Sequence, residues 1–232
     1  MLEVRRGLDR GYADHGWLKS YHTFSFDDYY DPVFENFGAL RVINEDRIKP
    51  GKGYTNKAHR DMEILTYVLA GELEHKDSLG NATVIRPGDV QRLSGGSGVS
   101  QSELNPSASQ EAHFLQIWIT PNETGQAPAY EQKHFATSER RGKLRLIASR
   151  TGEEGSLRIR QDTCVYTGFF NATERAELEV AKGRRAYAHV ASGSIAVNET
   201  RLNAGDGVKM TKPGHFTLQN GHDAHVLLFD LP

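Results

Sequence analysis

Apolar and polar residues alternate with a period of two along most of this chain, and no long window keeps the 3.6-residue period of an amphipathic helix. Such alternation is typical of strands with one buried face. It predicts strands over residues 39–43, 63–70, 82–85, 90–93, 113–120, 144–148, 156–161, 164–170, 186–191, 194–198, 207–210, 215–219 and 225–231. Many short strands at this spacing indicate an all-β fold, either a sandwich or a closed barrel.

The two halves of the chain share one pattern of turns. In the first half, a glycine turn at Gly71 is followed by a Pro-Gly-Asp turn at 87–89. In the second half, Gly193 is followed by an Ala-Gly-Asp turn at 204–206. Glycine at these places suits a backbone with positive φ, which a β-carbon resists. The repeat predicts a duplicated small barrel.

The polar, proline-bearing stretch 121–143 indicates where the two halves connect. We therefore expect a first barrel over residues 1–125, a linker over 126–134 and a second barrel over 135–232. The first barrel is expected to hold the functional cavity.

Composition narrows the class of protein. Charged residues make up 25% and hydrophobic residues 38%, which favours a globular protein, and the net charge of −2 predicts no direct binding to nucleic acid or an anionic membrane. The apolar runs are far shorter than the roughly 20 residues of a membrane span, and the amino terminus lacks the apolar core of a secretion signal. Cys164 is the single cysteine, so disulfides within the chain are excluded, and we expect it to be a core residue. A cytoplasmic location is expected.

Several short motifs occur in a defined order and carry a family resemblance. They are His22-Thr-Phe-Ser-Phe26, Tyr29-Tyr-Asp-Pro32, Leu40-Arg-Val-Ile-Asn44, Asp61-Met-Glu-Ile-Leu-Thr-Tyr67, His75-Lys-Asp-Ser78, Pro87-Gly-Asp-Val-Gln91, Ser102-Glu-Leu-Asn-Pro106 and the ending Leu-Leu-Phe-Asp-Leu-Pro232. Together they resemble the pirin family over nearly the whole chain. The resemblance implies two consecutive cupin (jelly-roll) β-barrels.

The resemblance also implies a function. Pirins hold one metal, usually iron, in the amino-terminal barrel through a His-x-His pair and a later His-x-Glu pair. Some members oxidise the flavonol quercetin with dioxygen, and the animal member is a transcriptional co-regulator. The spacing makes physical sense, because side chains at i and i+2 of a strand share one face.

This sequence departs from the family pattern at the ligand positions. It reads Lys57-Ala-His59 for the first pair and Gln101-Ser-Glu103 for the second. Lysine offers no lone pair at neutral pH, and a glutamine amide is a poor ligand for iron. Only His59 and Glu103 remain as family ligands, so we expect no tightly bound metal. The matching stretch of the second barrel, 181–185, has no histidine or carboxylate.

Two functions stay open from the sequence. The first is a metal-poor, pirin-like bicupin that binds a small aromatic ligand of the flavonol kind, or a protein partner. The alternative is a quercetin 2,3-dioxygenase-like enzyme that holds one divalent metal weakly (iron, nickel, copper or zinc) through His59 and Glu103, with Glu103 as the catalytic candidate.

A buried carboxylate needs a compensating charge. We therefore expect the Lys57 ammonium to replace the ion and to bond an ionised Glu103, directly or through one water, while Gln101 and His59 bond the remaining atoms. The alternative is that Lys57 extends out of the barrel mouth.

Other histidines receive structural interpretations. His75 is expected to anchor a turn or support the site. His222 and His225, which lie beside a glycine turn, are expected on the surface, and His15 and His22 are expected to pack without chemistry.

Overall fold

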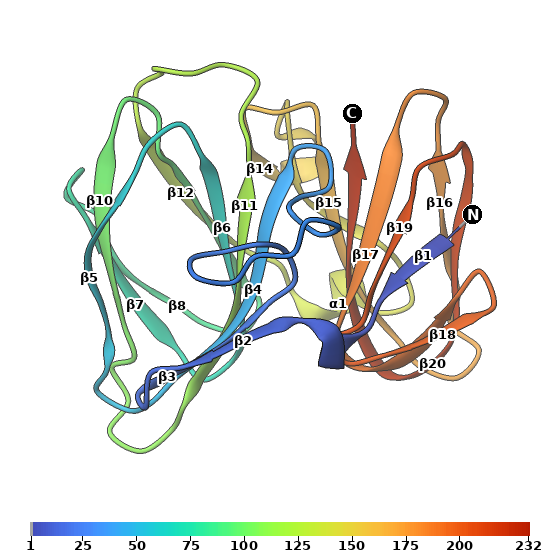
Figure 1. Cartoon of the computed structure of the whole chain (residues 1–232), viewed down its shortest axis with the longest axis horizontal. Coiled ribbons are helices and arrows are strands. Elements are labelled where there is room, and N and C mark those ends of the chain that lie inside the picture. Colours follow the sequence, from blue (N-terminus) through green and yellow to red (C-terminus); the bar gives the residue numbers. More distant parts are fainter. Residues whose placement is uncertain (1) are drawn as a thin grey trace.

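The computed structural model describes residues 2–232 and shows two β-barrels side by side (Figure 1). The first barrel pairs a seven-stranded sheet, ordered β12-β9-β6-β11-β4-β3-β2, with a four-stranded sheet, ordered β5-β10-β7-β8. Its strands are β2 (Gly11–Asp14), β3 (Leu18–His22), β4 (Leu40–Ile48), β5 (Gly53–His59), β6 (Glu63–Ala70), β7 (Leu73–Asp77), β8 (Ala82–Ile85), β9 (Asp89–Ser94), β10 (Val99–Leu104), β11 (Ala112–Ile119) and β12 (Ala129–His134). The all-β expectation is confirmed.

The second barrel is one nine-stranded sheet that bends around its own core. Its main order is β1-β19-β17-β20-β15-β13-β14, with β16 on β20 and β18 on β17. Its strands are β1 (Leu2–Arg5), β13 (Arg145–Ser149), β14 (Leu157–Arg158), β15 (Cys164–Phe170), β16 (Ala176–Val180), β17 (Arg185–Val197), β18 (Thr200–Asn203), β19 (Gly207–Met210) and β20 (Gly214–Leu231). Helical turns are short: η1 (Gly7–Asp9), α1 (Thr137–Arg140) and η2 (Glu153–Gly155). No helix within residues 2–232 is long and apolar enough to span a membrane.

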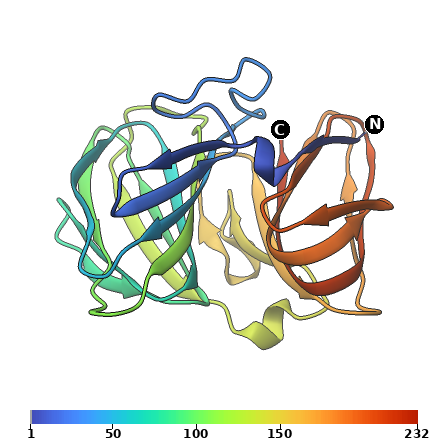
Figure 2. The same ribbon diagram turned by 60° about the horizontal axis from the view of Figure 1, so that its bottom comes forward.

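The boundaries between the barrels differ from the expected ones. Strand β1 pairs with β19 of the second barrel, so the chain begins there before it enters the first (Figures 1 and 2). The expected linker 126–134 contains β12, which pairs with β9 in the first barrel. The crossing to the second barrel comes later, around α1, at the lower edge of Figure 2. Polarity misled the linker prediction, because β12 is an edge strand with half-exposed side chains.

The repeated glycine turns have the expected backbone. Gly71 has φ +71° and Gly193 has φ +67°. A β-carbon on Gly71 would overlap the carbonyl oxygen of Glu111, and one on Gly193 would overlap that of Asp223. Both turns therefore need glycine for space as well as for φ.

The largest apolar cluster lies between the barrels rather than inside one of them. It joins Leu65 and Tyr67 of β6 and Leu115 and Ile117 of β11 to residues of the second barrel such as Phe229. Strand alternation turns the neighbouring residues of β6 and β11 into the first barrel. One face of these strands thus holds the barrels together, and the other lines the first barrel's interior.

A buried polar cluster crosses this interface. Arg140 of α1 is 4% exposed and donates from Nη1 to the Tyr67 hydroxyl, 2.7 Å away. The same hydroxyl lies 2.9 Å from Nε2 of His225 and 3.2 Å from Oγ1 of Thr167. Within residues 2–232, Arg140 forms no ion pair with a carboxylate. The expectation that His225 lies on the surface is wrong, because it is 6% exposed; His222 does lie on the surface.

Replacing Tyr67 with Phe tests this cluster. The change leaves the buried Arg140 charge without its hydroxyl acceptor, so the free energy of unfolding should fall by about 2–3 kcal/mol. Urea unfolding followed by fluorescence measures it. Tyr12→Phe is the control, since its exposed hydroxyl bonds only Asp14, and should change stability by less than about 0.5 kcal/mol. Equal effects of the two substitutions would contradict a structural role for the Tyr67 hydroxyl.

Candidate functional site

The four positions implied by the family resemblance lie on two adjacent strands. β5 and β10 pair antiparallel, with Gln101 opposite Lys57 and Glu103 opposite Tyr54. The register shifts between these pairs, beside Asn56, which has φ +51°. This irregularity is a β-bulge, and it brings Tyr54 rather than Thr55 directly across from Glu103.

The side chain of Gln101 forms a hydrogen bond with the imidazole ring of His59. The amide nitrogen of Gln101 lies 3.0 Å from Nε2 of His59, and its N–H can donate to the ring lone pair. Burial, and then the nearby Lys57 charge, lower the pKa of His59 to about 4, so the ring is neutral at pH 7. The ring stands edge-on to Trp118, with centroids 5.3 Å apart. In the tautomer with its lone pair on Nε2, this hydrogen bond uses the electron pair that a metal would need.

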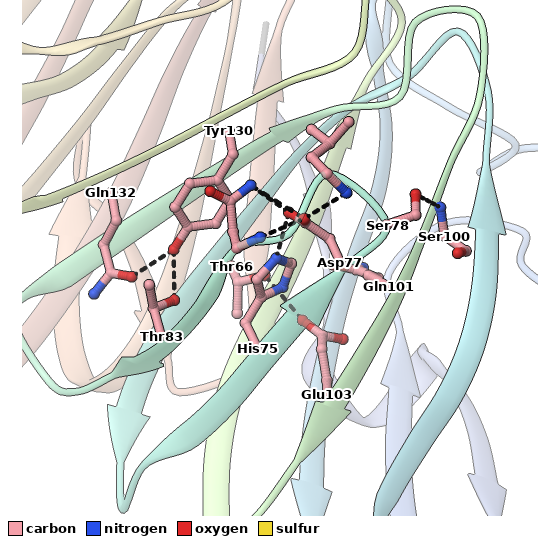
Figure 3. A network of polar contacts seen from close by, with 12 residues as sticks. Thr66, His75, Asp77, Ser78, Thr83, Ser100, Gln101, Glu103, Tyr130 and Gln132 are labelled. Atoms are coloured by element: carbon pink, nitrogen blue, oxygen red, sulfur yellow. Dashed lines mark hydrogen bonds and ion pairs between the residues drawn. The ribbon is translucent and has the colours of Figure 1, made fainter.

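Glu103 is enclosed by donors from the large sheet. It is 1% exposed, and it accepts hydrogen bonds from Thr66 Oγ1 at 3.2 Å and from Gln116 Nε2 at 2.5 Å (Figure 3 shows Thr66 beside it). Burial raises the pKa of Glu103 to about 7, against the opposing effect of Lys57. With a pKa near 7 the carboxyl group is close to half-ionised at neutral pH, because desolvation opposes the nearby charge, and the expected ionisation of Glu103 stays a prediction.

Lys57 is held by aromatic rings. Its ammonium lies 4.9 Å from the ring centroid of Tyr54, 5.3 Å from that of Trp118 and 5.5 Å from that of Phe26. Within residues 2–232 it forms no ion pair with Glu103, so the expected direct bond is contradicted. The cause is geometric, since the regular pairing of β5 and β10 sets Lys57 opposite Gln101, two residues from Glu103, and the rings attract the cation. A water-bridged contact stays a prediction.

The ammonium nevertheless acts on the interior charges. It lowers the pKa of Glu103, His59 and Asp46 by its electrostatic field. Asp46 is 3% exposed and its pKa is raised to about 6, chiefly by burial. One cation thus faces two buried carboxyl groups that are each partly protonated near neutral pH.

His75 anchors the turn after β7. It is fully buried, its Nε2 lies 3.0 Å from Asp77, and its ring stacks on Tyr130 (Figure 3). Asp77 in turn accepts hydrogen bonds from the backbone of Leu79 and Asn81. His75 lies directly opposite Glu103 in the sheet, so it supports the strand that carries the carboxyl group.

A cavity of about 600 Å³ opens onto Lys57. Its lining combines aromatic and polar side chains: His15, Trp17, Leu18, Ser20, His22, Phe26, Asp27, Tyr54, Thr55 and Lys57. Nε2 of His22 lies 2.9 Å from the hydroxyl of Ser20, which donates to Asp46. His15 and His22, expected only to pack, both line this cavity.

The residues at the four positions do not fit a metal ion. Lys57 supplies a cation, Gln101 supplies an amide that already bonds His59, and both oxygens of Glu103 accept hydrogen bonds. Within residues 2–232 no group of three or more histidine, cysteine, aspartate or glutamate side chains is arranged to hold a metal. What the arrangement offers instead is the Lys57 ammonium surrounded by aromatic rings.

Sequence reasoning missed the residues that surround Lys57. Phe26, Tyr54 and Trp118 come from three separate segments, and Asp46 lies on β4. The sequence pointed to two of these places only. Phe26 ends one of the family motifs, and alternation along β11 turns Gln116 and Trp118 to the same face.

Comparisons with known proteins agree over the whole chain. The sequence model of the pirin family matches residues 3–119, and that of the quercetinase C-terminal cupin domain matches residues 146–231. A quercetin 2,3-dioxygenase of Escherichia coli K12 is 42% identical over 232 residues, which cover 100% of this chain and 99% of that protein. A pirin-like protein of Caulobacter vibrioides is 41% identical, covering 97% of this chain and 98% of that protein.

Solved structures show the same likeness. The crystal structure of YhhW from Escherichia coli has a TM-score of 0.94 at 41% identity, covering 100% of this chain and 98% of that one. A structure of the bacterial pirin YhhW in complex with nickel(II) has a TM-score of 0.95 at 42% identity, covering 100% and 99%. The two barrels are thus cupin domains, as the motifs implied, and this chain belongs to the pirin family.

Proposed function

We propose that the first barrel of this pirin binds a small planar aromatic ligand with an acidic hydroxyl, of the flavonol kind, and does so without metal-dependent oxygenation. The observation that carries the proposal is the Lys57 ammonium, which replaces a family ligand and lies within 4.9–5.5 Å of three ring centroids at the wall of a 600 Å³ cavity. Cavities with aromatic walls and a few polar groups are typical small-molecule sites.

The charge of Lys57 selects the ligand class. An aromatic hydroxyl that ionises near neutral pH would pair with the ammonium, while Trp17, Phe26 and Tyr54 would contact the ring system. The cavity would partly withdraw the ammonium and the ionised hydroxyl from water, which strengthens their attraction. A metal cation in the same place would instead be repelled by Lys57 and would have to displace the Gln101 amide from His59.

A second candidate function has its own support. The similar Escherichia coli protein is named a quercetin 2,3-dioxygenase, and the similar YhhW structure holds nickel(II). On this alternative, one divalent metal binds weakly through His59 and Glu103. Both candidates use a flavonol-like ligand, so oxygen consumption and metal dependence distinguish them.

Metal binding provides the first test. The wild-type melting temperature should not respond to added Ni²⁺, because two ligand positions carry Lys57 and Gln101. The double variant Lys57→His/Gln101→His should regain four ligands, and Ni²⁺ at about 100 times its Kd should stabilise it by about 2–3 kcal/mol. Differential scanning fluorimetry with and without Ni²⁺ measures both. Stoichiometric metal that survives dialysis of the wild-type protein would contradict the proposal.

Ligand binding provides the second test. Titration of EDTA-treated protein with quercetin, followed by tryptophan fluorescence, should show binding that Lys57→Met weakens about tenfold, equivalent to about 1.4 kcal/mol. Lys52→Met is the matched control, since Lys52 is exposed and outside the cavity lining. Unchanged affinity in the Lys57 variant would refute the role of the ammonium. Oxygen uptake by the wild type that begins on adding Fe²⁺ or Ni²⁺ would favour the dioxygenase.

Glu103 provides a pH test of the interior. Because burial raises its folded pKa to about 7 from 4.5, the folded protein binds more protons than the unfolded chain between those values. The contribution to stability is therefore fully present below pH 4.5 and declines as pH rises toward 7. Glu103→Gln should remove this decline and be more stable than wild type at pH 8, by up to about 3 kcal/mol.

The difference between wild type and Glu103→Gln isolates this group from the buried histidines, whose lowered pKa values act in the opposite direction. Urea unfolding at pH 5 and pH 8 measures the difference. Glu111→Gln, at an exposed position, is the control. A wild-type advantage that grows with pH would show that Glu103 is ionised and stabilising.

A further inference from the structure

A pocket lined by arginines lies where the two barrels meet, separate from the cavity at Lys57. Its volume is about 460 Å³, and four of its lining residues are Arg92, Arg150, Arg158 and Arg160. Arg92 lies on β9 of the first barrel and Arg158 on β14 of the second, so both barrels contribute (Figure 1 labels β14 and the neighbouring β12). We call this the inter-barrel arginine pocket.

The carboxylates around the pocket leave most of this charge unpaired. Arg92 pairs with Glu131 at 3.3 Å, but Glu131 also pairs with Lys133 at 2.9 Å. Glu123 is the one carboxylate in the lining, and it is exposed. The buried Glu63 accepts a hydrogen bond from Ser94.

Of the other three guanidinium groups, that of Arg160 acts on the buried Glu63 through its charge, which opposes the effect of burial on the pKa of that carboxyl group. Within residues 2–232, Arg150, Arg158 and Arg160 form no ion pair with a carboxylate. The side chains of Arg150 and Arg158 are exposed, and they make no hydrogen bond to any residue within 2–232. Like charges gathered in a recess repel one another, so an anion between them would relieve that repulsion.

Two N–H donors are buried without an acceptor. They are Nε of Arg92, a residue that is 7% exposed, and Nη1 of Arg160. The hydroxyl of Ser94 and the carbonyl of Ala127 satisfy other nitrogens of these side chains, at 2.9 and 2.8 Å. Buried donors are normally paired, so these two mark a shortage of acceptors among residues 2–232 behind the pocket wall. Guanidinium groups match the paired oxygens of phosphate esters and carboxylates.

We propose that the inter-barrel arginine pocket binds a small polyanion carrying phosphoryl groups, of the size of a phosphorylated metabolite. The number of converging guanidinium groups favours phosphoryl groups, whose oxygens can accept from several directions, over a single carboxylate. Such a ligand would contact residues of both barrels and stabilise their packing. The inference goes beyond the proposed function, because none of these residues lines the cavity at Lys57.

Inorganic pyrophosphate is the probe, with orthophosphate and citrate as the comparison anions, all at matched ionic strength without divalent metal. Isothermal titration calorimetry and thermal unfolding should show that pyrophosphate binds and raises the melting temperature beyond the effect of sodium chloride. Arg150→Gln/Arg158→Gln should weaken binding about tenfold or more. Both side chains are exposed and make no hydrogen bond, and the bond from Arg158 to Glu131 comes from the backbone N–H, so this variant should fold.

The matched control is Arg141→Gln/Lys182→Gln, which removes the same charge at exposed positions outside the pocket. Unchanged pyrophosphate affinity in this control supports the proposal, as does retained quercetin binding in the pocket variant. Absence of pyrophosphate binding, equal weakening in both double variants, or tighter binding of citrate than of pyrophosphate would overturn it.

Discussion

Two carboxyl groups, Asp46 and Glu103, lie inside the first barrel, and burial makes each of them costly to ionise. A bound divalent cation would remove that cost by supplying charge. The residues around Glu103 supply several smaller effects: hydrogen bonds from Thr66 and Gln116, the field of the nearby Lys57, and a pKa raised far enough for partial protonation. Because no single partner neutralises Glu103, the ammonium is free to face the cavity. The ligand chemistry proposed for the barrel follows from this division of roles.

The same strands position the site and hold the barrels together. On β6, Thr66 bonds Glu103, while Leu65 and Tyr67 on either side belong to the apolar cluster between the barrels. On β11, Gln116 is flanked in the same way by Leu115 and Ile117. A shift of either strand by one residue would exchange its two faces. The hydrogen bond to Glu103 and the apolar contacts between the barrels would then both be lost. The interface therefore stabilises the register on which the geometry around Glu103 depends.

Hydrophobicity predicted strands such as β6 and β11, because most of their residues are apolar and buried. It missed β5 and β10, the strands that carry the site. Their inward side chains are polar or charged, so neither face is apolar enough to show the period. The bulge at Asn56 was equally invisible, and with it the pairing of Tyr54 with Glu103. His225 was misplaced because the sequence around it resembles a glycine turn, whereas the structure continues β20 through this stretch and the His225 side chain reaches the buried interface.

The replacements at positions 57 and 101 work as one unit. Suppose that Lys57 alone were histidine: the Gln101 amide would still occupy the lone pair of His59, and the site would lack a third free imidazole. If Gln101 alone were histidine, the ammonium would still repel a divalent cation and would lower the basicity of the new ring. Either single change also disturbs an arrangement that now works, since Lys57 offsets Glu103 and Gln101 bonds His59. On the proposed function, the interior is a consistent alternative to a metal centre, and two coupled substitutions separate the two arrangements.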